Sequence, residues 1–92
     1  MVVSLTNHDI NEIALHLFSQ IEFDDDGNQD LHTTYSTSNA DVELTAGFFC
    51  GSVLVEEYTA IDEDSKEMAM LDSDLTAIED IVNKKLKNLW QH

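Results

Sequence analysis

The chain contains no arginine and no proline, and it has few lysines, glycines and cysteines. Its 92 residues include four lysines, three glycines and one cysteine. Cys50 cannot form an internal disulfide, and beside Gly51 it suits a small turn residue better than a reactive thiol. No apolar run approaches the roughly 18 residues that cross a membrane, and the first residues form no basic leader. We therefore expect a soluble cytoplasmic protein.

Positive charge is the scarcest property of the sequence. Nineteen acidic residues stand against four lysines, which gives a formal net charge of −15 at pH 7. Three of those lysines, Lys84, Lys85 and Lys87, lie close together near the C-terminus. This balance disfavours direct binding to DNA, RNA or an anionic membrane, and it favours a basic protein partner.

Motifs of catalysis are missing as well. The sequence holds no G-x-S-x-G, H-E-x-x-H or C-x-x-C motif and no glycine-rich phosphate loop. Carboxylates are abundant, but a pair such as Glu56 and Glu57 is expected to point to opposite faces of a strand. We expect no enzymatic activity, no catalytic residue and no cofactor.

The stretch from residue 40 to residue 60 is the richest in strand-forming residues. Its two arms flank Cys50 and Gly51, a pattern that predicts a half-buried β-hairpin in which Phe49 pairs with Ser52. The period of two places one set of residues on the core face: Val42, Leu44, Ala46, Phe48, Val53 and Val55. The other face is then expected to carry Asp41, Glu43, Thr45, Glu56 and Tyr58.

Two amphipathic helices are predicted on either side of the strands. The first covers residues 7–20, with Thr6 or Asn7 as its cap, and its apolar stripe is Ile10, Ile13, Ala14, Leu17, Phe18 and Ile21. The second begins after Asp72 or Ser73, and its stripe is Leu75, Ile78, Val82, Leu86 and Leu89. Three residues flank this second stripe, where they pack over the sheet margins or meet a neighbouring protein: Ala77, Ile81 and Trp90.

The remaining segments complete the predicted fold. Residues 31–37 are rich in threonine, and one set of residues alternates with another: Leu31, Thr33, Tyr35 and Thr37 with His32, Thr34 and Ser36. This pattern is typical of a strand at a sheet edge or on an outer face. Residues 61–67 read as a charged loop, and residues 68–71 as either a fourth short strand or a turn. The order α-β-β-β-(β)-α predicts one small acidic α+β domain over residues 1–92. Its three- or four-stranded antiparallel sheet would carry the N- and C-terminal helices on one face.

Two patterns in the sequence resemble metal sites in part. With Gly27 at the sixth position of a calcium loop, Glu22, Asp24 and Asp26 occupy the first, third and fifth, but Thr33 takes the twelfth, where a bidentate glutamate is needed. A solvated acidic turn is the better interpretation. The second pattern is a row of residues spaced four apart, for which a solvated helix face is the simpler account: His8, Glu12 and His16. We expect no metal.

A protein-binding surface remains, and its acidity defines the partner. Side chains two apart on a strand lie about 6.6–6.8 Å apart, so Asp41 and Glu43 form a row of anions on a stiff support. Acidic turns could extend this row, and the expected partner-binding residues are Asp41, Glu43, Glu56, Asp24, Asp25, Asp26, Asp62, Glu63 and Asp64. Such a surface could enter the basic groove of a nucleic-acid-binding enzyme.

In size and charge alone, the chain resembles the nucleic-acid mimics with which phages and mobile elements block restriction or CRISPR nucleases. An alternative is an acidic accessory or assembly protein that binds through its C-terminal helix or an edge strand, and a homodimer is also compatible with the sequence. Acidity can also serve solubility alone. Carboxylates clustered on an exposed sheet face would favour mimicry. An uncovered patch of Ala77, Ile81 and Trp90 would favour assembly.

Overall fold

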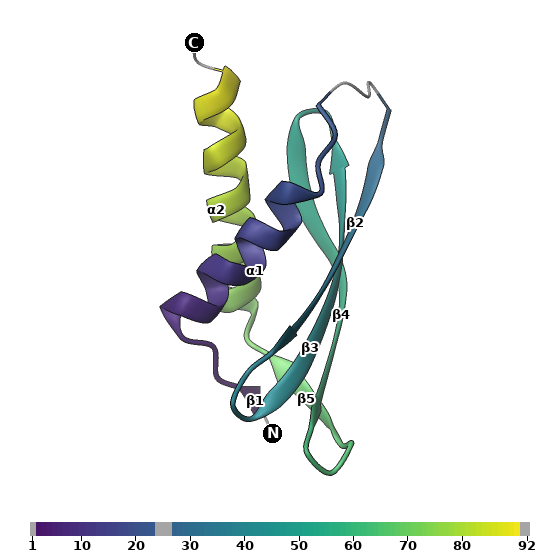
Figure 1. Ribbon diagram of the computed structural model, residues 1–92, viewed down its shortest axis with the longest axis vertical. Helices are drawn as coiled ribbons and strands as arrows, with labels where there is room; N and C mark the ends of the chain where they lie inside the picture. Colours follow the sequence, from purple (N-terminus) through teal and green to yellow (C-terminus); the bar gives the residue numbers. More distant parts are fainter. Residues whose placement is uncertain (1, 24–26, 91–92) are drawn as a thin grey trace.

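The computed structural model describes residues 2–23 and 27–90 of the chain. Within these residues the protein is an α+β fold with a five-stranded mixed sheet and two helices. The elements in chain order are β1 (Val2–Val3), α1 (Asn7–Ser19), β2 (Gln29–Ser36), β3 (Ala40–Phe49), β4 (Ser52–Asp62), β5 (Glu67–Met70) and α2 (Asp72–Trp90). Both helices cover the same face of the twisted sheet (Figure 1). We call this the helix face, and the opposite one the outer face.

The strand order across the sheet is β1-β5-β4-β3-β2. Strands β2 to β5 form an antiparallel meander, as predicted, and the segment that sequence left ambiguous becomes β5, with Met68 and Met70 buried. The fifth strand, β1, was not predicted. It pairs with β5 in parallel through Val2 opposite Ala69, so the sheet is mixed. Two residues are too few to show a period, and the partner strand is distant in sequence.

The central hairpin has the predicted register at its tip. Phe49 pairs with Ser52, and Cys50 and Gly51 form the connecting turn with φ angles of 54° and 79°. Positive φ at both positions is typical of a two-residue hairpin turn whose twist matches that of the flanking strands. The helix face of this hairpin lies in the core, since Val42, Leu44 and Ala46 are all buried.

Helix α1 begins with a capping box. The hydroxyl of Thr6 accepts a hydrogen bond from the Asp9 backbone N–H at 3.1 Å, and the Asp9 carboxylate accepts one from the Thr6 N–H at 3.0 Å. These two bonds satisfy donors that the first helical turn leaves open. The predicted stripe then packs over β2 and against α2. Its buried members are Ile10, Ile13, Ala14, Leu17 and, just beyond the end of the helix, Ile21.

Helix α2 buries the middle of its stripe, Ile78, Val82 and Leu86. Ala77 and Ile81 are half-buried and pack against the same core. The shoulder formed by these two residues is therefore largely covered within the chain, as packing at the sheet margin requires. The side chain of Trp90 lies outside the described part of the structure.

Candidate functional site: the acidic outer face of the sheet

The outer face is built by the side chains of β3 that alternate with the buried ones. Asp41 and Glu43 lie there, exposed, between buried neighbours that point to the helix face. Neither β3 nor any other strand contains lysine or arginine. Strand register adds further acids, and the exposed carboxylates that share this face are Asp30, Asp41, Glu43, Glu56, Glu57 and Glu67.

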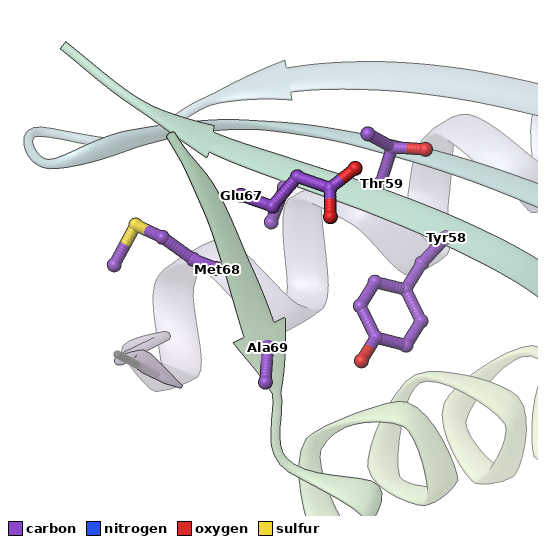
Figure 2. A pocket seen from close by; sticks show the side chains of 6 residues that line it. Tyr58, Thr59, Glu67, Met68 and Ala69 are labelled. Atoms are coloured by element: carbon purple, nitrogen blue, oxygen red, sulfur yellow. The ribbon is translucent and has the colours of Figure 1, made fainter. Parts of the chain in front are cut away.

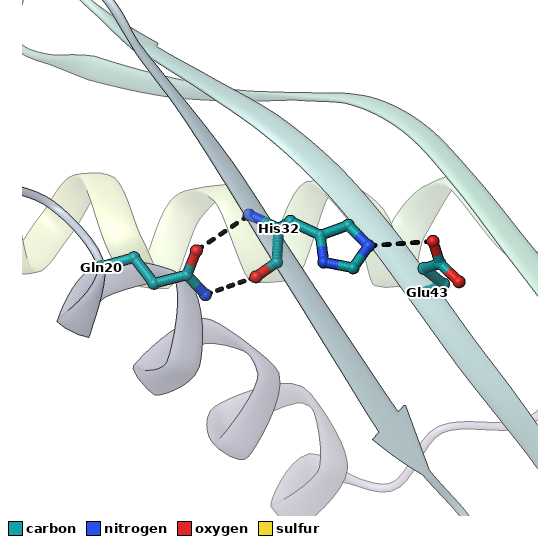
Figure 3. A network of polar contacts seen from close by, with 3 residues as sticks. All are labelled: Gln20, His32 and Glu43. Atoms are coloured by element: carbon teal, nitrogen blue, oxygen red, sulfur yellow. Dashed lines mark hydrogen bonds and ion pairs between the residues drawn. The ribbon is translucent and has the colours of Figure 1, made fainter.

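Neighbouring side chains hold two of the predicted carboxylates in place. The Ser36 hydroxyl donates to Asp41 Oδ1 at 2.8 Å. His32 Nε2 lies 2.9 Å from Glu43 Oε1, and Figure 3 shows the contact between these two side chains. A carboxylate is an acceptor only, so this ring nitrogen carries the proton. Both contacts cross from β2 to β3 and orient the two carboxylates.

A β-bulge interrupts β4 at Glu56 and brings Glu57 to the outer face beside it. Between Thr45 and Ala46 the register shifts, so that Glu56 is an extra residue on β4 and Glu57 pairs with Thr45. The Glu56 carboxylate lies over Gly47, in the space that a Cβ at Gly47 would take. A side chain at Gly47 would therefore displace this carboxylate, whose flexible side chain can move aside. Both adjacent glutamates therefore face outwards, and the prediction that they point to opposite faces was wrong.

The same bulge overturns the predicted position of Tyr58. This residue pairs with the buried Leu44, so its ring lies on the helix face and not beside the acids. Its hydroxyl accepts a hydrogen bond from the Met70 backbone N–H at 3.3 Å. A strict period of two cannot anticipate the change, because one inserted residue reverses the side of every residue after it.

The acidic turn after β4 has a structural function as well. Asp62 Oδ1 accepts hydrogen bonds from the backbone N–H groups of Asp64 and Lys66, both at 2.9 Å, so Asp62 shapes the turn. Glu63 and Asp64 are exposed. A hollow of about 110 Å³ has both Asp41 and Asp62 in its lining, so the structure brings this turn to one end of the acidic row. The predicted residues Asp24, Asp25 and Asp26 lie outside the described residues.

Three outer-face acids were missed from sequence: Asp30, Glu57 and Glu67. Asp30 pairs across from Gly47, and its position follows from the alternation of β2 once that strand is extended backwards from Leu31. Glu57 depends on the bulge, and Glu67 depends on β5 being a strand. The alternation in the sequence could have revealed the first but not the other two.

Two larger hollows also have outer-face acids in their linings. One, of about 280 Å³, spans β2, β3 and β4, and the side chains it shares with the outer face are Thr34, Ser36, Asp41, Glu43, Thr59 and Ile61. The other, of about 460 Å³, opens between β4 and β5 (Figure 2), where Glu67 and Thr59 point away from Tyr58. Its lining contains no cluster of acid, base and nucleophile of the kind that catalysis needs.

The predicted histidine row is divided by the structure. His16 Nδ1 lies 3.3 Å from the Thr33 hydroxyl, and the ring meets Tyr35 edge-on at 6.4 Å between centroids. His16 therefore contacts β2, although the residue stays exposed. Across residues 2–23 and 27–90, no group of three histidine, cysteine, aspartate or glutamate side chains is arranged to hold a metal ion.

One perturbed pair of titratable groups joins α1 to β2. The Tyr35 hydroxyl donates to Asp9 Oδ1 at 2.9 Å. The pKa of Asp9 is lowered, first by the hydrogen bond from the Thr6 backbone and also by the bond from Tyr35, while partial burial opposes the shift. The pKa of Tyr35 is raised, mainly by the hydrogen bond to Asp9 and also by the charge of Glu12. The hydrogen bond between Tyr35 and Asp9 therefore links β2, at the edge of the sheet, to α1.

Neither described helix is long and apolar enough to cross a membrane. Comparison of the chain with protein-family models, with curated proteins and with solved structures finds no match.

Proposed function

We propose that the protein is a non-enzymatic binding module whose acidic outer face engages a basic partner. The partner class that suits it best is a nucleic-acid-binding enzyme, whose phosphate groove the carboxylates would occupy. The observation that supports this proposal is charge separation within the fold. Exposed acids gather on the bare face of the sheet, whereas Lys84, Lys85 and Lys87 lie on α2 and Lys66 lies in a turn.

The spacing of the charges is compatible with a mimic of nucleic acid. Asp41 and Glu43 place one charge per roughly 6.7 Å along β3. One strand of B-DNA carries one charge per roughly 3.4 Å. Glu57 lies diagonally across from Glu43 on the adjacent strand, at a typical separation of about 7–8 Å. Asp41, Glu43 and Glu57 thus form a short track of three carboxylates, with spacings about twice that of the phosphates along one strand of DNA.

The test is capture from a nuclease-treated bacterial lysate at low and moderate salt, followed by addition of DNA or RNA. We expect a basic nucleic-acid-binding protein to be retained and then displaced by the competitor. The variant Asp41→Asn/Glu43→Gln/Glu56→Gln should retain none of it. A control that removes equal charge elsewhere, Glu22→Gln/Asp72→Asn/Asp80→Asn, should bind normally. Equal capture by both variants would place the binding surface elsewhere.

Assembly through α2 is the second candidate. Its support is narrower than sequence suggested, because Ala77 and Ile81 pack against the core. Leu71 and Leu89 remain 47% and 44% exposed on the N- and C-terminal sides of the helix. A captured partner that ignores both salt and nucleic acid, and that is lost when Leu89→Ser is introduced, would establish this function instead.

A further inference from the structure

Side chains of α2 close the free backbone edge of β4 near the hairpin tip. The Val53 N–H donates to Asn83 Oδ1 at 2.7 Å, and Asn83 Nδ2 donates back to the Val53 carbonyl at 3.1 Å. The Val55 N–H donates to Glu79 Oε2 at 2.6 Å. These backbone groups point to where a neighbouring strand would pair, so the helix side chains replace that strand.

The other edge of the sheet, β2, is closed in the same way at one position. The His32 N–H donates to Gln20 Oε1 at 2.9 Å, and Gln20 Nε2 donates to the His32 carbonyl, as Figure 3 shows. Gln20 is the C-cap residue of α1. Its amide thus pairs with both outward groups of His32 as a strand would.

Beyond His32 the edge of β2 is open. In an antiparallel ladder, alternate residues direct both N–H and C=O away from the partner strand, so Thr34 and Ser36 share the outward orientation of His32. The bond from the Thr37 N–H to the Ala40 carbonyl, 2.8 Å, agrees with this alternation. No hydrogen bond joins these backbone groups of Thr34 and Ser36 to another part of residues 2–23 or 27–90.

Both sides of this open edge are acidic. On the outer face, Thr34 and Ser36 line the 280 Å³ hollow together with Asp41 and Glu43. On the helix face, Tyr35 donates to Asp9, and Glu12 is close enough for its charge to raise the pKa of the Tyr35 phenol. Side chains of an added strand alternate between these two faces, so a lysine or arginine on either side would meet a carboxylate.

We propose that Thr34–Ser36 is a docking edge at which an extended segment of the basic partner, bearing lysine or arginine, adds to the sheet as a strand beside β2. The backbone groups of Thr34 and Ser36 fix the segment in register, and its basic side chains enter the outer-face hollow. The inference rests on the proposed function, because the basic character of the partner comes from it. It adds where and in which conformation that partner binds.

The probe is an acetylated, amidated heptapeptide of alternating lysine and threonine. Its control has the same sequence with every backbone nitrogen methylated, which keeps the charges and removes every backbone donor. Titration of the ¹⁵N-labelled protein should slow amide exchange at Thr34 and Ser36 with the first peptide only. We expect the methylated peptide to bind at least about tenfold more weakly.

Two comparisons keep the inference separate from the proposed function. The ratio of the affinities of the two peptides tests the edge, and the variant Asp41→Asn/Glu43→Gln/Glu56→Gln tests the acidic face. Equal binding of both peptides to the wild type, with weak binding of both to the triple variant, would overturn the docking edge and leave the acidic face intact. Undiminished binding to the triple variant would overturn the proposed surface.

A protein variant gives a second measure of the edge. Thr34→Pro removes an N–H that points away from β3, so the β2–β3 ladder stays whole. This variant should bind the unmethylated peptide as weakly as the wild type binds the methylated one. If the variant does not fold, the affinities of the two peptides for the wild type still test the docking edge. Concentration-dependent dimerisation of the wild type that Thr34→Pro abolishes would make a second copy the occupant and overturn the choice of a basic segment.

Discussion

The two faces of β3 differ sharply in burial although their residues alternate along one strand. Val42 and Leu44 on the helix face are 2% and 0% exposed, and Asp41 and Glu43 between them are exposed. The helix face supplies apolar burial and therefore stability. The outer face contributes little to burial, so its composition is free to serve the partner binding that we propose. Keeping burial on one face lets a small fold carry many like charges on the other.

The largest expected effect is the loss of a core side chain from the helix face. Leu44→Ala should lower the free energy of unfolding by about 2–4 kcal/mol, because it leaves a cavity in a fully buried site. Leu54→Ala, on the outer face and 51% exposed, should cost less than about 0.5 kcal/mol. Urea unfolding of both variants at fixed salt measures the contrast. Equal losses would show that the two faces do not differ in stability.

The next effect concerns the hydrogen bonds between side chains of α2 and the backbone edge of β4. Asn83→Ala removes the partner of the Val53 N–H and carbonyl and should cost about 1–3 kcal/mol. Amide exchange at Val53 should become faster than in the wild type. Asn88→Ala, at an exposed position of the same helix, is the matched control for helix propensity. If Asn83→Ala lowers the free energy of unfolding no more than the control does, water replaces Asn83 as the hydrogen-bond partner of the Val53 backbone.

The third effect isolates repulsion on the outer face. Raising salt from low to moderate concentration should raise Tm by a few degrees, because about 1 kcal/mol corresponds to roughly 4–8 °C in a domain of this size. The rise should be smaller for Asp41→Asn/Glu43→Gln/Glu56→Gln than for Glu22→Gln/Asp72→Asn/Asp80→Asn, which carries the same net charge. Thermal unfolding followed by circular dichroism measures both. An identical rise in the two variants would show that repulsion is spread evenly over the surface.

The smallest effect lies at the capping box on the helix face. The folded pKa of Asp9 is below its ordinary value, so its contribution to stability is complete above the unfolded pKa of about 3.9 and is lost as pH falls through the lower folded pKa. Asp9→Asn should be less stable than the wild type by roughly 0.5 kcal/mol at pH 7. Urea unfolding from pH 7 to about pH 3 should show this difference shrinking. A difference that stays constant would mean that the carboxylate charge is not involved.

Local patterns predicted most of the elements but not the finer geometry of the sheet. The alternation around Cys50 and Gly51 gave the hairpin register, and the helical stripes gave α1 and α2, because these signals depend on neighbours in sequence. The bulge at Glu56 and the parallel pairing of Val2 with Ala69 depend on contacts between distant segments. Those contacts decide on which face each later residue lies.

In the candidate site, too, alternation predicted some positions, and contacts between distant segments determined the others. Asp41, Glu43 and Glu56 were placed on the correct face from alternation, whereas the bulge at Glu56 brought Glu57 to that face as well. Tyr58 was placed on the wrong face for the same reason. The backbone groups left open at Thr34 and Ser36 have no signature in sequence, since any residue supplies them.

The hydrogen bonds that Glu79 and Asn83 of α2 make to the edge of β4 have a consequence for folding during translation. The hairpin of β3 and β4 leaves the ribosome before Glu79 and Asn83, so the nascent sheet has a second open edge until α2 has emerged and docked. An unpaired edge is a template for pairing with other chains. We therefore expect the protein to be most prone to aggregation, and most accessible to chaperones, in the interval between completion of the hairpin and arrival of its last helix.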